Sequence, residues 1–241
     1  MSNPSPAKKR SPYRHLFFDL DHTLWDFESN CRLTMAEIYD TMDLKARGVD
    51  DFERFHQLYL RHNDGLWEKY RNGQIRVEEM RWKRMWLTML DFKIADEGLC
   101  KNMGEVFLDL LPTRNILFPN TLEILRYLGD KGYALHLITN GFEKTQHAKL
   151  KNSGLDGFFQ KVITSEQAGS LKPKKEIFDY ALLQAAALAT ESIMLGDSLE
   201  VDIQGARNAG IDQVYVNHLG RPALPQPTFV VGSLKELENI F

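Results

Sequence analysis

Six short apolar runs constrain the fold of this chain more than any other feature. They are predicted as strands and cover residues 15–20, 133–139, 161–164, 192–197, 213–217 and 229–231. Helical patterns separate the later runs, and strands that alternate with helices form parallel sheets through right-handed crossovers. The sequence therefore predicts an α/β fold with a parallel sheet that helices cover on both faces.

Helices are expected wherever apolar residues recur with a period near 3.6. In the second part of the chain they are predicted at about 120–131, 143–152, 174–188, 200–209 and 233–240. Asn120, with Glu123 three residues later, is typical of a helix start at which each side chain caps the other's main chain. The glycine at 132 suits the end of that helix.

A long helical segment interrupts the alternation directly after the first strand. No strand pattern survives between residues 27 and 111, and three glycine-containing breaks divide this part into about four helices. Because the strands resume afterwards, the segment is predicted to be a cap inserted into the sheet domain. We expect the cap at 27–111 and the core at 14–26 and 112–241.

Composition limits the partners of the protein. The 241 residues carry a formal net charge of −3, so no broad basic field is available for nucleic acid polymers. No apolar run is long enough to span a bilayer, and residues 1–13 form a polar, proline-containing segment predicted to be a flexible tail, without the apolar stretch of a signal peptide. Two cysteines cannot build a disulfide framework. We expect a cytoplasmic protein with no membrane partner; its oligomeric state is not predicted.

Polar residues follow several predicted strands at the points where the strands end. They are Asp19, Asp21 and Thr23 after the first strand, Thr139 and Asn140 after the second, Lys172 before the helix that follows the third, and Asp197, Ser198 and Asp202 after the fourth. Ligands of open parallel sheets bind beyond the carboxyl ends of the strands. We therefore expect these side chains to form one site.

The carboxylates of such a site would repel one another. Two like charges about 4 Å apart cost roughly 4 kcal/mol at an effective dielectric constant of 20. A hard divalent cation removes the conflict, and Mg²⁺ prefers a few carboxylates, water and a phosphate oxygen. Lys172 would reduce the charge further. This combination predicts magnesium-dependent phosphoryl transfer, in which catalysis consists mainly of positioning and charge stabilisation.

Three aspartates receive the central roles. Asp19 is predicted as the nucleophile, because a carboxylate can form an aspartyl phosphate and divide one difficult step into two. Asp21 is predicted as the general acid and base, since crowding by other carboxylates favours its protonated form. The Asp19 carboxylate, the Asp21 main-chain carbonyl and Asp197 are expected to bind Mg²⁺.

The remaining polar residues are expected to support this chemistry. Thr139, Asn140 and Lys172 would hold the phosphoryl oxygens, together with main-chain N–H groups of the turns. Thr23, Ser198 and Asp202 are expected to orient the residues that contact the phosphate and the metal. Asp202 would orient Lys172 or a metal-bound water. Taken singly, each residue has a plainer interpretation as a turn, cap or surface residue. Their order and placement together carry the prediction.

The motifs resemble those of a known superfamily. DLDHT at 19–23, ITN at 138–140, LKP at 171–173 and GDSLEVD at 196–202 are similar, in the same order, to the four motifs of the haloacid dehalogenase superfamily. The resemblance covers nearly the whole chain from His15 onward. It implies a Rossmann-like core with an inserted helical cap and the roles assigned above.

Two details of the first motif narrow the expectation. Asp21 is typical of the phosphatases in the superfamily, and DLDHTLWDF at 19–27 resembles the nucleotide 5′-monophosphatases that act on pyrimidine and modified nucleotides. The resemblance thus implies a small phosphorylated substrate of the nucleoside 5′-monophosphate type. His22, where sugar-phosphate and phosphoglycolate phosphatases commonly have glycine, and the aromatic residues Trp25 and Phe27 are candidates for substrate specificity. Turn formation for His22 and helix packing for aromatic side chains are the plainer interpretations.

Other functions share part of this pattern and stay open. They are a sugar-phosphate or phosphoglycolate phosphatase, a phosphomutase or phosphotransferase, a phosphoryl-receiving signalling domain, and a non-catalytic phosphate-binding protein. A signalling receiver carries its phosphoacceptor on a middle strand of a shorter domain, whereas Asp19 follows the first strand and precedes a large insertion. Steady turnover of a phosphomonoester would separate an enzyme from a receiver.

Overall fold

The computed structural model describes residues 13–241, which form two compact units. The sheet unit comprises the chain up to Leu24, Leu117–Asn140 and Gly157–Phe241, and the helical unit comprises Trp25–Ile116 and Gly141–Asp156. The predicted tail falls on residues 1–12, outside the described part, and on Tyr13. Tyr13 is buried, and its hydroxyl donates a hydrogen bond of 2.6 Å to Asp212.

The sheet unit contains six parallel strands in the order β3-β2-β1-β4-β5-β6. The strands are β1 (His15–Phe18), β2 (Ala134–Thr139), β3 (Lys161–Thr164), β4 (Ser192–Gly196), β5 (Asp212–Val216) and β6 (Phe229–Val231). All six were expected from their apolar runs, and the parallel sheet confirms the predicted fold class. β1 lies between β2 and β4, with Phe18 in register with Leu137 and Leu195. The segments that follow these three strands therefore leave the sheet at one edge.

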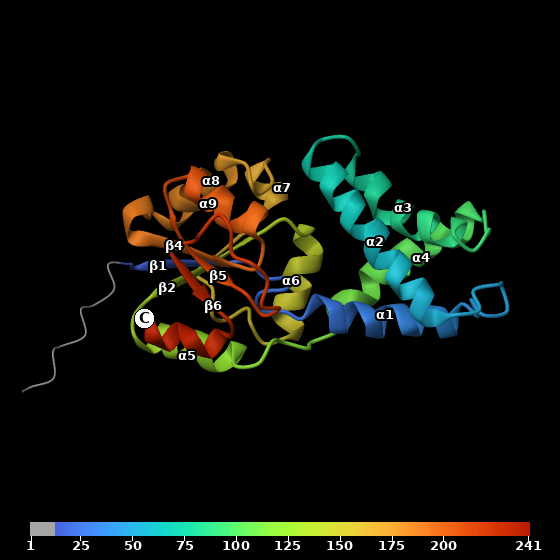
Figure 1. Ribbon diagram of the computed structural model, residues 1–241, viewed down its shortest axis with the longest axis horizontal. Coiled ribbons are helices and arrows are strands. Elements are labelled where there is room, and N and C mark those ends of the chain that lie inside the picture. Colours follow the sequence, from blue (N-terminus) through green and yellow to red (C-terminus); the bar gives the residue numbers. More distant parts are fainter. Residues whose placement is uncertain (1–12) are drawn as a thin grey trace, which may run out of the picture. The chain divides into compact units, whose positions relative to one another are not determined.

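Helices cover both faces of the sheet (Figure 1). They are α5 (Thr121–Asp130), α7 (Ser165–Ala168), α8 (Lys175–Ala185) and α9 (Gly205–Asn208), with the short helices η2 (Ala189–Glu191), η3 (Leu199–Gln204) and η4 (Leu234–Asn239). The buried side chains of Phe17, Ile138 and Met194 pack with α8 and α9 on one face. On the other face lie α5 and η4 (Figure 1).

Several predicted helix details differ from the structure. The helix expected at 174–188 ends at Ala185, and the terminal helix expected at 233–240 is a 3-10 helix, η4. Asn120 is in the left-handed region, with φ of 67°, and its side chain makes no cap hydrogen bond, so the predicted capping is wrong. The helix expected at 200–209 is a π-helix, η3, followed by the short α9. Its wider turn is visible where the Ser198 carbonyl accepts from the N–H groups of both Asp202 (3.0 Å) and Ile203 (3.1 Å).

The helical unit contains the four helices expected between the first two strands. They are α1 (Phe27–Thr41), α2 (Phe52–Arg71), α3 (Val77–Leu90) and α4 (Glu97–Leu110), followed by η1 (Leu111–Thr113); the unit also includes α6 (Glu143–Asn152). Three of the helices start at an aspartate whose carboxylate accepts main-chain N–H groups, which satisfies donors of the first turn. These N-caps are Asp26, Asp51 and Asp96.

The α6 segment packs with the other helices of the helical unit. Phe142, just before α6, stacks on Trp67 with 5.8 Å between ring centres, and Asn152 donates a hydrogen bond of 2.7 Å to the Pro112 carbonyl. The sequence-based boundary counted this segment with the core. The division into a core and a cap as domains stays a prediction.

The chain leaves and re-enters the sheet unit at neighbouring points. It departs after Leu24 and returns at Leu117. The Leu24 carbonyl accepts hydrogen bonds from the Phe118 N–H (2.9 Å) and from the Thr121 hydroxyl (3.1 Å). Both ends of the intervening segment are therefore tied to the same place.

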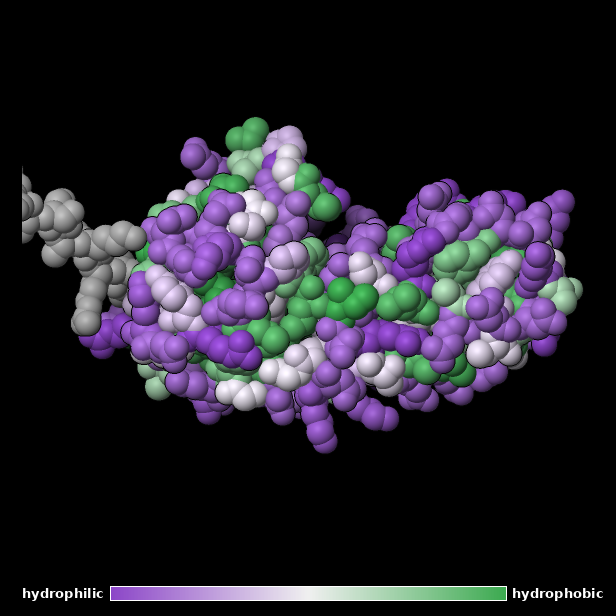
Figure 2. Space-filling view, turned by 90° about the horizontal axis from the view of Figure 1, so that it is seen from below, coloured by the Kyte–Doolittle hydropathy of each residue, from purple (hydrophilic) through white to green (hydrophobic). Residues whose placement is uncertain are grey.

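The surface shows no sign of a membrane-spanning element among residues 13–241. None of their helices combines the length and apolar character that crossing a bilayer requires. Most of the face seen in Figure 2 is hydrophilic, with hydrophobic residues between the polar ones.

Candidate active site

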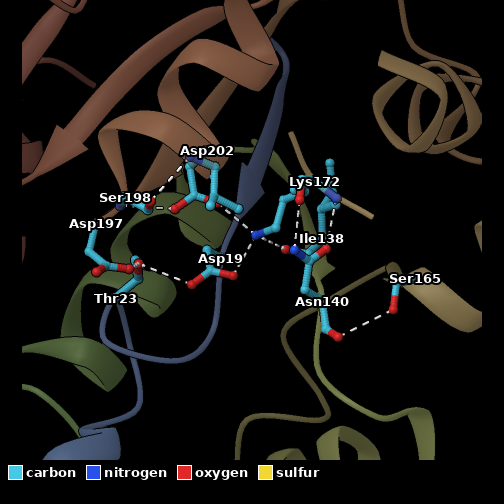
Figure 3. A network of polar contacts seen from close by, with 10 residues as sticks. Asp19, Thr23, Ile138, Asn140, Ser165, Lys172, Asp197, Ser198 and Asp202 are labelled. Carbon is cyan, nitrogen blue, oxygen red and sulfur yellow. Dashed lines mark hydrogen bonds and ion pairs between the residues drawn. The ribbon is translucent and has the colours of Figure 1, made fainter. Parts of the chain in front are cut away.

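The candidate site lies at the carboxyl edge of the sheet, where the central strands end (Figure 3). Asp19 directly follows β1 and Asp197 directly follows β4. The Asp19 N–H donates to the Leu195 carbonyl at 2.9 Å, which extends the pairing of β1 and β4 by one residue. Asp19 is buried, with 8% of its surface exposed. Pairing with β4 therefore holds the main chain of Asp19 at the end of a central strand.

Lys172 connects three groups at this edge. Its Nζ donates to Asp19 Oδ1 (2.6 Å), to Asp202 Oδ1 (2.7 Å) and to the Ile138 carbonyl (2.7 Å). An ammonium group has three donors, so each is used once. Only 1% of the lysine is exposed. The aliphatic stem thus brings a fully partnered positive charge into the site.

The Thr23 hydroxyl lies between two of the aspartates. Its Oγ1 is 3.2 Å from Asp197 Oδ1 and 3.4 Å from Asp19 Oδ2, and its single hydrogen can serve one of them at a time. The Thr23 carbonyl lies 3.1 Å from His218 Nε2, and the His218 ring stacks on Phe118 at 3.9 Å between centres. These contacts hold the turn that follows Asp19.

Asp202 is placed by the wide turn of η3. Its Oδ2 accepts the Ser198 N–H at 3.1 Å, while the Ser198 hydroxyl accepts the Val201 N–H and caps the helix. Gly196 makes room for this carboxylate, because a Cβ at residue 196 would come within 2.4 Å of the Asp202 carboxyl carbon. Both oxygens of Asp202 are therefore used within the protein.

Two buried carboxylates and one half-buried carboxylate form a cluster that could hold a metal ion. Asp19, Asp197 and Asp202 each offer an oxygen, and these oxygens lie within 4.8 Å of one another. Burial raises the pKa of Asp19, against the attraction of Lys172, and burial together with Asp202 raises the pKa of Asp197. For Lys172, burial alone would lower the pKa, but Asp19 and Asp202 outweigh it and the pKa rises. Ionised carboxylates that lie this close together repel one another, and a hard divalent cation, which prefers oxygen ligands, would relieve the repulsion.

The other predicted site residues of the sheet unit lie around this cluster. Thr139 is buried at the end of β2, and Asn140 follows it. Asp21 and His22 are half-buried, and His22 adopts a left-handed conformation with φ of 64°. The side-chain amide of Asn140 bonds to the main chain of Lys172. The catalytic, metal and phosphate roles of all these residues stay predictions.

Trp25 and Phe27 belong to the helical unit. Trp25 is fully buried, and the Lys149 ammonium lies 4.3 Å from its ring centre and 5.7 Å from that of Phe27. A buried indole in contact with a cation favours a packing role for Trp25. Its part in substrate choice, like that of Phe27 and His22, stays a prediction.

Two residues of the site were missed in the sequence. Ser165 follows β3 directly, and its hydroxyl donates to the Asn140 carbonyl at 3.2 Å. His218 follows β5 by two residues and contacts the Thr23 carbonyl. Both stand after the ends of strands, so the signal that identified the other polar residues was present for them as well.

Comparisons with known proteins agree with this geometry. The model of the haloacid dehalogenase-like hydrolase family matches residues 13–210. The pyrimidine 5′-nucleotidase YjjG of Escherichia coli is 32% identical over 93% of this chain and 96% of its own. The pyrimidine 5′-nucleotidase PynA of Streptococcus pneumoniae is 31% identical over 93% of each chain.

A solved structure shares this fold. YfnB from Bacillus subtilis, crystallised with bound magnesium, superposes with a TM-score of 0.82 at 27% identity, covering 95% of this chain and 98% of that one. The sheet order, the buried acidic cluster with its lysine and the family match together confirm the resemblance drawn from the motifs. The chain belongs to the haloacid dehalogenase-like hydrolase family.

Proposed function

We propose that this protein is a magnesium-dependent phosphatase that forms an aspartyl phosphate on Asp19, and that its preferred substrates are pyrimidine nucleoside 5′-monophosphates. The observation that carries the reaction is the buried Asp19 carboxylate, held by Lys172 at 2.6 Å on the end of a central strand. The substrate class is supported by the similarity to YjjG and PynA over 93% of the chain.

Asp19 and Asp21 divide the chemistry between them. Asp19 attacks phosphorus, so that its bond to phosphorus forms while the bond to the leaving oxygen breaks. Asp21 gives its proton to the leaving oxygen and then takes a proton from the water that attacks the aspartyl phosphate. The second attack releases inorganic phosphate and restores the Asp19 carboxylate.

The charges of the cluster support the proposed use of a metal ion. Three carboxylates and one ammonium leave two uncompensated negative charges when all are ionised. Asp19, Asp197 and the main-chain carbonyl of Asp21 would hold Mg²⁺, which suits a small set of hard oxygen ligands. Bound there, Mg²⁺ would offset these carboxylates and the charge of the phosphoryl group. Asp202 orients Lys172, because its two oxygens already accept from Lys172 and from the Ser198 N–H.

The phosphoryl oxygens need donors from the neighbouring strand. Thr139 is assigned to them because it is buried at the carboxyl end of β2. Lys172 supplies the positive charge, which lies next to Asp19. The Asn140 amide is engaged with the Lys172 main chain, so the phosphate contact at residue 140 is assigned to the main-chain N–H.

A screen of phosphorylated metabolites tests the substrate class. UMP, CMP and dTMP are compared with AMP, GMP, sugar phosphates and phosphoglycolate in the presence of Mg²⁺, with an EDTA-treated sample alongside. We expect the highest kcat/KM on the pyrimidine nucleotides and no activity after chelation. A clear preference for sugar phosphates or phosphoglycolate would overturn the substrate class and leave the reaction intact.

The Asp19→Asn variant tests the reaction itself. An amide is a poor nucleophile, so turnover is expected to fall at least about 10³-fold, while circular dichroism shows a folded protein. Wild-type enzyme quenched in acid is expected to carry phosphate that the variant lacks. Substantial turnover by the folded variant would remove Asp19 from the mechanism.

A further inference from the structure

Asn140 holds the main chain of Lys172 with both ends of its side-chain amide. Its Nδ2 donates to the Lys172 carbonyl at 2.9 Å, and its Oδ1 accepts the Lys172 N–H at 2.8 Å (Figure 3). The amide therefore satisfies both main-chain groups of one residue, as a neighbouring strand would do. We call this pair of hydrogen bonds the Asn140 clamp.

The clamp acts where regular structure is missing. Lys172 lies between α7 and α8, in a segment without strand or helix hydrogen bonds. Fixing a residue in such a segment costs backbone entropy, and ordering a long lysine side chain costs further entropy. The Asn140 clamp supplies the main-chain part of this ordering.

Both ends of Lys172 are attached to the same strand terminus. Its main chain bonds to Asn140, and its Nζ donates to the carbonyl of Ile138, two residues earlier in the chain. The Ser165 hydroxyl donates to the Asn140 carbonyl at 3.2 Å, and Ser165 is itself buried after β3. The ends of β2 and β3 thus determine where the ammonium lies relative to Asp19.

We propose that Asn140 is a positioning residue that acts through Lys172, with Ser165 supporting it, and that its side chain does not bind substrate. The effect on activity rests on the proposed phosphatase function. A charged group that is held in place in advance needs no reorganisation during the reaction. Displacement of a catalytic group by about 1 Å can lower the rate about 10²-fold.

The chain contains a matched control for this clamp. Asn217 directly follows β5, as Asn140 follows β2, and it makes the same pair of hydrogen bonds. Its Nδ2 donates to the Arg221 carbonyl at 2.8 Å, and its Oδ1 accepts the Arg221 N–H at 2.9 Å. Arg221 is exposed. Asn217→Ala therefore removes an equal clamp that holds no buried ammonium.

A double-mutant cycle tests the proposal. Wild type, Asn140→Ala, Lys172→Ala and the double variant are assayed with p-nitrophenyl phosphate, so that nucleotide preference does not enter. We expect Asn140→Ala to lower kcat/KM about 10- to 100-fold, Asn217→Ala to change it less than about threefold, and the double variant to equal Lys172→Ala. If the Asn140 side chain contacted substrate directly, Asn140→Ala would lower activity further even in the Lys172→Ala background. If the loss of kcat/KM in the double variant equals the product of the losses in Asn140→Ala and Lys172→Ala, the proposal is wrong.

Amide exchange provides a readout that is independent of activity. Hydrogen–deuterium exchange of peptides covering residues 169–174 is expected to be slow in the wild type and in Asn217→Ala and at least about tenfold faster in Asn140→Ala. Unchanged exchange in Asn140→Ala would overturn the clamp. If the wild type hydrolyses no phosphomonoester, the phosphatase proposal fails and exchange alone decides on the clamp. If Asn140→Ala does not fold, Asn140→Asp takes its place, because it keeps the acceptor for the Lys172 N–H and sets an oxygen against the Lys172 carbonyl.

Discussion

Both units of the described residues contain deeply buried cations, and two of these, Lys172 in the sheet unit and Arg84 in the helical unit, are held in different ways. Lys172 in the sheet unit has three acceptors, two of them carboxylates. Arg84 in the helical unit is 3% exposed, and its Nη1 donates to Asn63 Oδ1 at 3.1 Å. Its Nε and Nη2 have no hydrogen-bond partner among residues 13–241, and its Cζ lies 4.7 Å from the centre of the Phe107 ring.

Lys172 is a buried charge paired with carboxylates, whereas Arg84 is a buried charge without a carboxylate among its hydrogen-bond partners. Burying a charge is costly unless it is paired and hydrogen-bonded. Lys172 offsets carboxylates that would otherwise repel one another, so its removal leaves those carboxylates uncompensated. Arg84 has an amide oxygen and an aromatic face instead, and both are weaker partners. The comparison predicts a large effect at Lys172 and a small one at Arg84.

Lys172→Met is the strongest test, because it keeps the length of the side chain and removes its charge. Asp19 and Asp202 then face each other in a buried position, and the free energy of unfolding is expected to fall by about 3–5 kcal/mol. Phosphatase activity is expected to fall at least about 10²-fold. Urea denaturation and an assay with p-nitrophenyl phosphate measure the two effects. A variant as stable as the wild type would break the comparison.

Gly196→Ala disturbs the same cluster through shape alone. The new Cβ would lie 2.4 Å from the Asp202 carboxyl carbon, so Asp202 must move away from Lys172. We expect about 1–3 kcal/mol of destabilisation and about 10²-fold lower kcat/KM. Gly129→Ala is the control, because a Cβ there meets nothing within 4 Å, and its stability should rise by up to about 1 kcal/mol. Full activity in Gly196→Ala would show that the position of Asp202 does not matter.

His136 is a buried residue of the sheet unit whose surroundings favour the neutral imidazole. Its ring is stacked on Phe17, and its Nε2 lies 3.1 Å from Nδ1 of His15. Burial, together with His15 and Lys161, lowers the pKa of His136 to about 4. Between pH 6.5 and 4 the unfolded chain takes up a proton on His136 that the folded protein binds poorly, so the contribution of His136 to the free energy of unfolding should fall as the pH falls and level off above about pH 7. Unfolding free energies measured from pH 4.5 to 8 should show a weaker slope in His136→Phe. Equal slopes would contradict the lowered pKa.

Arg84→Met should have the smallest effect. The change removes a buried charge with two unpartnered nitrogens and keeps most of the side-chain volume, while it forfeits the contact with Phe107, worth about 0.5–2 kcal/mol. The free energy of unfolding is expected to stay within about 1 kcal/mol of the wild-type value. A loss of more than about 3 kcal/mol in urea denaturation would show that Arg84 is held as strongly as Lys172.

Much of the sheet could be predicted from the sequence, since each strand is a short apolar run. The polar residues at strand ends could be grouped for the same reason, because parallel strands bring their carboxyl ends to one edge. Asn140 shows where this reasoning stops. Its position was expected, but its partner, Lys172, lies in a segment without periodicity, and the hydrogen bonds between them depend on how that segment folds back.

Local conformation was the other part that the sequence did not reveal. The pattern at 200–209 indicates a helix, but η3 is a π-helix, in which each hydrogen-bonded turn contains one residue more than in an α-helix. Over so few residues, the periodicity of apolar positions cannot distinguish the two kinds of helix. Asn120 could cap a helix or adopt the left-handed region, since asparagine tolerates both. The grouping of α6 with the helical unit depends on contacts of Phe142 and Asn152 with distant residues, which sequence order does not contain.

The hydrogen bonds at Leu24 have a consequence for the ancestry of such a chain. Because the Leu24 carbonyl accepts from Phe118 and Thr121, residues 25–116 form an excursion that starts and finishes at one place. Exchange of that excursion for another one would not reroute any strand, and long surface insertions add little loop-closure entropy. A lineage of such chains can therefore exchange residues 25–116 as one piece while the strands around Asp19, Lys172 and Asp202 keep their order.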